Sequence, residues 1–226
     1  MRFLLVAATG LELAPLVGRL ASAGSPADRM QSFTHSSHQI DMLTAGVGMV
    51  ATATWCVRAL ARQSYDLALN LGVCGSFSTA YPLGAVVNVV SDCLPELGAE
   101  DGEQFLTVHQ LGLLGLDEPP FHGGRLVNPE PKAHALIGAL PGVSGITVNT
   151  VHGDAESIER VVARVKPDVE SMEGAAFMYA CLVSGARFAQ VRAVSNMVER
   201  RNRDAWKLKE AVDALNDVAL RVIESA

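Results

Sequence analysis

Short apolar runs alternate with longer amphipathic stretches along most of the chain. The apolar runs have the length of strands and place apolar side chains at consecutive positions, which is typical of strands buried on both faces. They predict strands at Phe3–Ala8, Ile40–Thr44, Leu67–Leu71, Val86–Val90, Gly145–Thr150 and Phe188–Val194. Apolar residues at helical spacing between these runs predict helices at Leu13–Ala23, Val50–Gln63, Pro131–Leu140, Glu156–Val165, Glu173–Ser184 and Ala205–Ile223.

Strands that alternate with helices indicate an α/β fold with three layers, αβα, in which helices cover both faces of a central twisted sheet. Residues 92–130 are rich in Gly, Pro and acidic residues and predict a long irregular excursion. The fragments AGSPAD and ELGAEDGE are too short to be linkers between domains. We therefore expect one domain over residues 1–226.

Composition narrows the function classes. The 226 residues are 49% apolar and carry a net charge of -6, so the chain can bury a sizeable core and offers no basic stripe for nucleic acid. No run approaches the roughly 20 apolar residues that a membrane-spanning helix needs, and MRFLLVAATG reads as a first strand, not a signal peptide. We expect a cytoplasmic protein with no membrane or nucleic-acid partner.

The cysteines and histidines suggest no cofactor or metal. The four cysteines lie in apolar surroundings without a C-x-x-C pair, which favours reduced thiols in the core. None of the six histidines stands at metal-ligand spacing from an acid or a Cys, and His152 is the one expected near a ligand. The Gly-x-Gly segment at Gly46–Gly48 lacks the third glycine of a dinucleotide fingerprint, so a tight turn without ligand explains it equally well.

Several predicted strands end in small or polar residues, in the segments AATGLE, TAGVGMV, NLGVCGS and VSN. Ligands of open α/β sheets bind where such carboxyl ends converge. Glu12 follows the first strand, where the dipole of a helix could also explain a carboxylate. Glu173 opens an apolar helix, and ribose hydroxyls would compensate its burial; the alternative is a helix N-cap, a position at which Glu is uncommon.

These segments, together with LGAVVNVVSD, TVHGDAES, VESMEGAA and VRAVSNMVE, resemble the nucleoside phosphorylase and nucleosidase superfamily along nearly the whole chain. The Met172-Glu173 pair and the strand end RAVSN are the most specific pieces. The resemblance implies that Glu12 activates the attacking water, that Met172 lies beneath the sugar and that Glu173 accepts the ribose hydroxyls. Ser195 would orient the residue that handles the purine N7 edge, which is Asn196 here.

The resemblance also implies a nucleoside and water as substrates and at least a homodimer. It implies further substrate contacts at Val47, in the pocket for the 5′ group, and at Val73, Gly75 and Val151.

Asn196 replaces the aspartate of the adenine-specific nucleosidases. An amide donates and accepts without ionising, so it fits the N7 and 6-oxo edge of hypoxanthine or guanine. The 6-oxopurine phosphorylases of the superfamily also use Asn, but they hold phosphate with arginines. Neither ATGLE nor Asn70-Leu71 before the glycines offers an arginine, and Glu12 would repel the anion. Hydrolysis of a 6-oxopurine nucleoside is therefore favoured over phosphorolysis.

The stretch SNMVERRNRDAWKLKEA looks like the subfamily that releases hypoxanthine in menaquinone biosynthesis, whose substrate carries an aromatic carboxylate on the 5′ side. Arg200, Arg201 or Arg203 could pair with that group, and we nominate Arg201. A solvated loop with arginines paired to Glu199 and Asp204 is the alternative. Trp206 falls where related nucleosidases place an aromatic over the ligand, and packing in the core is the alternative.

Two departures from the superfamily pattern leave questions open. Glu156 stands where the adenosine-type enzymes place a stacking phenylalanine, and Phe77 is a possible substitute. Arg192 lies inside an apolar strand, where a buried ion-pair role is expected over a catalytic one. The other readings are a methylthioadenosine or S-adenosylhomocysteine nucleosidase, a purine nucleoside phosphorylase, and a non-catalytic nucleoside-binding protein, against which the retention of both Glu12 and Glu173 speaks.

Overall fold

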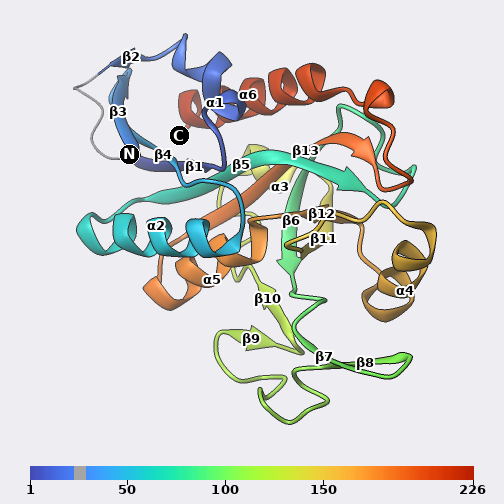
Figure 1. The fold of residues 1–226 in the computed structure, drawn as a ribbon. Coiled ribbons are helices and arrows are strands. Elements are labelled where there is room, and N and C mark those ends of the chain that lie inside the picture. The colour runs from blue at the N-terminus through green and yellow to red at the C-terminus, as the bar shows by residue number, and fades with distance from the viewer. Residues whose placement is uncertain (23–28) are drawn as a thin grey trace.

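The computed structural model describes residues 1–22 and 29–226, and most of its strands form one mixed sheet. In the described residues eleven strands join in the order β2-β3-β4-β1-β5-β12-β11-β6-β10-β9, with β13 paired to both β5 and β6 (Figure 1). Their bounds are β1 Arg2–Ala7, β2 Ala21–Ser22, β3 Met30–His35, β4 His38–Thr44, β5 Leu67–Ser76, β6 Val86–Asp92, β9 Phe121–His122, β10 Arg125–Val127, β11 Gly142–Thr147, β12 Val169–Ser171 and β13 Phe188–Met197.

The strand β13 closes part of this sheet into a ring. It runs parallel to β5 and antiparallel to β6, while β5 also reaches β6 through β12 and β11. The five strands β5, β12, β11, β6 and β13 therefore form a small closed barrel, and its strands carry most of the site described below.

Helices cover both faces of the sheet. The helices are α1 Gly10–Val17, α2 Met49–Arg62, α3 Ala135–Gly138, α4 Ala155–Val165, α5 Gly174–Ser184 and α6 Leu208–Glu224. Alternate residues of β1 point to opposite faces, so Phe3 packs in a core with α1 and α6, while Leu4 packs in a second core with α2 and α5. Figure 1 shows these two helix pairs on either side of the sheet, and the predicted αβα class with a mixed, twisted sheet is confirmed.

The strand and helix predictions need corrections at several boundaries. The strands predicted to end at Leu71 and Val194 continue to Ser76 and Met197, because β5 and β13 go on pairing with each other past the glycines, through Asn196 with Gly75 and Met197 with Ser76. The strand predicted at Gly145–Thr150 is β11, Gly142–Thr147. The helix predicted at Pro131–Leu140 shrinks to α3. The helix predicted from Leu13 is α1, which ends at Val17; its expected last residue and AGSPAD lie outside the described residues.

The segment 92–130 is more regular than predicted. It contains the hairpin of β7 Gly98–Asp101 and β8 Gln104–Thr107 as well as β9 and β10, which extend the main sheet. Backbone pairing, which composition does not reveal, orders this Gly-rich and acidic stretch. The four cysteines are buried and form no disulfide, as predicted. Among the described residues, no helix has both the length and the apolar character needed to cross a bilayer.

Candidate active site

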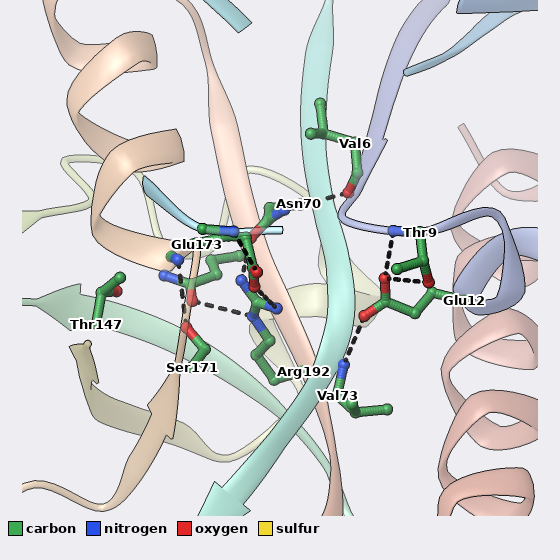
Figure 2. Close-up of polar contacts among 12 residues, drawn as sticks. Val6, Thr9, Glu12, Asn70, Val73, Thr147, Ser171, Glu173 and Arg192 are labelled. Carbon is green, nitrogen blue, oxygen red and sulfur yellow. Dashed lines mark hydrogen bonds and ion pairs between the residues drawn. The ribbon is translucent and has the colours of Figure 1, made fainter. Parts of the chain in front are cut away.

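Glu12 reaches from the start of α1 toward β5. Its Oε2 accepts from the backbone N–H of Thr9 at 2.9 Å and from the Thr9 hydroxyl at 3.1 Å. Its Oε1 accepts a longer bond of 3.4 Å from the N–H of Val73 (Figure 2). One oxygen is thus fixed by the turn before the helix, while the other faces β5 with only a weak partner.

Glu173 is buried at the beginning of α5, with 6% of its surface exposed. It occupies the N-cap position of the helix, but its side chain makes no capping hydrogen bond. Instead Oε1 accepts from the N–H of Gly48 at 3.1 Å, and Oε2 lies 3.6 Å from Nη1 of Arg192. The capping alternative is therefore wrong for this side chain, and the carboxylate points toward the glycine turn before α2.

Arg192 is held by three partners in the interior. It is 1% exposed; Nε donates to Gln190 at 3.2 Å, Nη2 donates to Asn70, and Nη1 pairs with Glu173. Figure 2 shows Arg192 with Asn70 and Glu173 across β5 from Glu12. The prediction of a buried ion-pair partner is confirmed, and because the guanidinium is committed to these contacts, it is poorly placed to hold a phosphate dianion.

Other residues cap α5 in place of Glu173. The N–H of Gly174 donates to Ser171 Oγ at 3.2 Å, and the N–H of Ala175 donates to Thr147 Oγ1 at 2.7 Å. The Thr147 hydroxyl in turn donates to Asp92 at 3.1 Å. These partners satisfy the helix terminus, so the Glu173 carboxylate is free to face a ligand.

Asp92 connects this cap to Arg192. Its Oδ2 accepts from Nε2 of Gln190 at 3.1 Å, and Gln190 accepts from Arg192. Burial raises the pKa of the Asp92 carboxyl to about 6, although the hydrogen bonds from Gln190 and Thr147 act in the opposite direction. A continuous buried network therefore links Asp92 to Glu173.

Ser195 orients the amide of Asn196. The Ser195 hydroxyl donates to Asn196 Oδ1 at 2.9 Å, and Nδ2 of Asn196 donates to the carbonyl of Met197 at 3.0 Å. An amide nitrogen carries two hydrogens, so one N–H remains to donate. The bulge in the pairing of β13 with β5, between Val194 and Asn196, accompanies this placement.

A small cavity of about 60 Å³ lies beside Asn196. Its lining combines the ends of β5, β12 and β13 with the connections from β11 to α4 and from β13 to α6, and consists of Gly75, Val151, His152, Glu170, Asn196, Met197, Glu199, Arg201, Asn202 and Trp206. The structure thus brings together six residues that the sequence analysis expected near the ligand, namely Gly75, Val151, His152, Asn196, Arg201 and Trp206. The N–H of Lys207 donates to the carbonyl of Ser195 at 2.9 Å, which ties the connection to β13.

Arg201 and Arg203 both lie against Trp206, with guanidinium carbons 5.1 and 6.0 Å from the ring centroid. Within the part of the chain that the structure describes, no ion pair joins an arginine to Glu199 or Asp204, so the alternative of a loop held by such pairs has no support. Arg201 therefore stays a candidate for binding an anionic group at the cavity wall.

The remaining predicted residues lie around the two acids. Val73 lies beside Glu12 through its N–H. Met172 is half-buried directly before Glu173. Val47 is 58% exposed next to Gly48, whose N–H binds Glu173.

Neither Phe77, the possible substitute for the stacking phenylalanine, nor Glu156, which stands at its place in the sequence, lies in the cavity lining. Phe77 packs in an apolar cluster with residues of β11 and α4, and Glu156 forms a surface ion pair with Arg160. In residues 1–22 and 29–226, no group of three or more His, Cys, Asp or Glu side chains is arranged to hold a metal ion.

Sequence reasoning missed Glu170. This carboxylate is 3% exposed and lines the cavity on the strand before Met172. Its signal in the sequence was an acid three residues before Glu173 in the segment DVESMEG, where attention to Met172-Glu173 passes over it.

Relatives resemble this chain over most of its length. A futalosine hydrolase of Streptomyces coelicolor is 33% identical over 186 residues, which cover 78% of this chain and 75% of that protein. A futalosine hydrolase of Thermus thermophilus is 31% identical over 187 residues, covering 80% of each. The predicted subfamily resemblance is confirmed as a likeness to futalosine hydrolases at this level of identity.

Solved structures share the fold. A futalosine hydrolase of Helicobacter pylori superposes with a TM-score of 0.82 at 14% identity, over all of this chain and 98% of the other. An S-adenosylhomocysteine nucleosidase of Streptococcus pyogenes gives 0.81 at 17% identity, over 100% and 97%. The phosphorylase superfamily model matches residues 2–224. The chain therefore belongs to the phosphorylase superfamily.

Proposed function

We propose that the protein hydrolyses the N-glycosidic bond of futalosine, a 6-oxopurine nucleoside, and releases hypoxanthine and dehypoxanthinyl futalosine. The observation that carries the proposal is the amide of Asn196, whose oxygen is occupied by Ser195 while one of its N–H groups is free. A free donor suits the N7 and O6 atoms of hypoxanthine, which are both acceptors.

Three residues around the sugar support the chemistry. Cleavage passes through an oxocarbenium-like sugar, which nearby negative charge stabilises. Glu12 supplies that charge through Oε1 and takes a proton from the attacking water, while Glu173 accepts hydrogen bonds from the ribose hydroxyls. Met172 forms the apolar floor below the sugar. Donation from Asn196 to N7 stabilises the leaving purine as its bond to the sugar breaks.

Water is favoured over phosphate as the nucleophile. Glu12 and Glu173 are two carboxylates against the one guanidinium of Arg192, so the sugar site carries a net negative charge. A phosphate dianion would be repelled from it, since anion sites of this kind rely on uncommitted cations.

The test is base release from futalosine, methylthioadenosine and inosine, each with and without inorganic phosphate. We expect hypoxanthine from futalosine at a rate that phosphate does not change. Release of adenine from methylthioadenosine without hypoxanthine from futalosine would favour the adenosine-type nucleosidases. A requirement for phosphate would favour a phosphorylase, and binding without release of any base would indicate a nucleoside-binding protein.

We also propose that the protein works in the cytoplasm, in menaquinone biosynthesis, as at least a homodimer. Support for the assembly comes from exposed apolar side chains near the two acids, with Leu11 77% exposed, Val47 58% and Val50 83%. Covering such surfaces is the usual basis of subunit association. Sedimentation equilibrium at micromolar concentration is expected to give twice the chain mass or more, and the mass of a single chain would contradict a dimer.

A further inference from the structure

Glu170 is a buried carboxylate that the chemistry proposed above does not use. It lies on β12 opposite Gly75 of β5, and Gly75 is also the partner of Asn196 on β13. A Cβ atom added to Gly75 would lie 2.9 Å from Cγ2 of Val198, 3.1 Å from Nδ2 of Asn196 and 3.5 Å from Cγ of Glu170. The amide and the carboxylate therefore lie close together around Gly75, and both line the same cavity.

The protein satisfies Glu170 only in part. Its Oε1 accepts from the N–H of His152 at 3.1 Å, and its Oε2 lies 2.7 Å from Nδ1 of the same residue. Within the described ranges these contacts with His152 are its hydrogen bonds, and no lysine or arginine pairs with it. An ionised carboxylate has about four acceptor positions, so a buried one with a single partner residue retains acceptor capacity toward the cavity.

The two groups present a donor beside an acceptor. A 6-oxopurine shows the complementary order along its edge, because N7 and O6 accept and N1 carries a hydrogen. In adenine the donor and acceptor roles at position 6 and at N1 are exchanged: the 6-amino group donates, and N1 carries a lone pair and no hydrogen. A carboxylate facing the lone pair of adenine N1 would be repelled and left unpaired, and sites built around such a hydrogen bond reject the analogue that lacks it.

We propose that Glu170, held by His152, accepts the N1–H of the purine and so determines specificity for 6-oxopurine nucleosides together with Asn196. This inference rests on the proposed function, because it concerns the base of the same substrate. It assigns the two halves of base recognition to different strands of the closed barrel, with Asn196 at N7 and O6 and Glu170 at N1.

The experiment compares the wild type with Glu170→Gln on futalosine and on its analogue with a 6-amino group. Glutamine keeps the size of the side chain and can donate to the bare N1 of the analogue. The amide oxygen of glutamine can still accept the N1–H but lacks the charge of the carboxylate, so we expect kcat/KM for futalosine to fall by about 10-fold, while that for the analogue rises. The matched control is Glu96→Gln, because Glu96 also accepts from a backbone N–H but lies outside the cavity. The control should leave both values within twofold.

A second measurement needs no variant. Binding of hypoxanthine to the wild-type protein is compared with binding of its 1-deaza analogue, in which a C–H replaces the N1–H. We expect the analogue to bind at least 10-fold more weakly; equal dissociation constants would overturn the assignment of Glu170 even if the variant did not fold.

The two proposals fail in different ways. If the wild type released no hypoxanthine from futalosine, the proposed function would be wrong. If the wild type were active and Glu170→Gln kept the same ratio of kcat/KM for the two substrates, the function would stand and the reading of N1 by Glu170 would be refuted.

Discussion

Gly72 separates the two halves of the sugar site, and its replacement by alanine tests their geometry. A Cβ at this position would overlap Nη1 of Arg192 and lie 3.0 Å from Oε1 of Glu12. Arg192 is 1% exposed and bound to Gln190, Asn70 and Glu173, so it cannot move away without breaking one of these contacts. The substitution therefore displaces the guanidinium, Glu12 or both.

The expected size of the effect follows from these contacts. Adding a methyl group to a packed interior costs about 1–3 kcal/mol of unfolding free energy. Misplacing a reacting group by about 1 Å costs roughly 100-fold in rate, so we expect kcat/KM for base release to fall by about that factor. Steady-state kinetics and urea unfolding on the same samples separate the loss of activity from the loss of stability.

Gly142→Ala provides the control for Gly72→Ala. Gly142 also lies in a strand, and its added Cβ would meet Val90 at 3.4 Å, an ordinary contact. We expect this variant to keep wild-type kinetics and to unfold at the same urea concentration or a slightly higher one, since alanine restricts the unfolded chain. If Gly72→Ala behaved like Gly142→Ala in both assays, the close approach of Glu12 and Arg192 at β5 would be refuted.

Three further changes test other parts of the site. Asn196→Asp should shift the ratio of kcat/KM toward 6-aminopurine nucleosides, because a carboxylate accepts from the 6-amino group; an unchanged ratio would show that Asn196 does not contact this edge. Trp206→Ala should raise KM about 10-fold by removing an aromatic wall of the cavity, and an unaltered KM would place the ring outside the reach of the ligand. Burial raises the pKa of Asp92 from 3.8 to about 6, so the folded state binds the proton more tightly than the unfolded state and ionised Asp92 costs stability above pH 6. As pH falls from 7 to 4, the wild type should gain up to about 3 kcal/mol of unfolding free energy relative to Asp92→Asn, and urea unfolding with a pH-independent difference would contradict the buried charge.

The sequence predicted well what depends on local periodicity. The central strands and the helices α2, α4 and α5 appear within a few residues of their expected bounds, because consecutive apolar residues and helical spacing report burial directly. The segment MQSFTH was missed as β3 because it is mostly polar, and its pairing with β4 on the outer part of the sheet makes it a strand.

The site was predictable where it coincides with a motif and was missed where it depends on pairing between strands. Glu12, Glu173 and Asn196 stand in motifs of the superfamily, so the resemblance alone identifies these positions as candidate site residues. Glu170 could not be found in this way, because its place in the cavity results from the antiparallel pairing of a three-residue strand with β5. The contact of Arg192 with Glu173 was expected only as an unspecified ion pair, since chain order does not show which acid lies opposite.

The closed barrel divides the cavity wall into two parts with different tolerance of change. Gly75, Glu170 and Asn196 belong to strands that are hydrogen-bonded around a ring without a free edge, so none of them can shift without disturbing its neighbours. Arg201 and Trp206 belong to the connection between β13 and α6, outside the sheet. Substitutions in that connection can therefore remodel one wall while the residues on the barrel strands keep their positions. Under the proposed function, the scaffold could then accept new groups on the sugar without losing its choice of base.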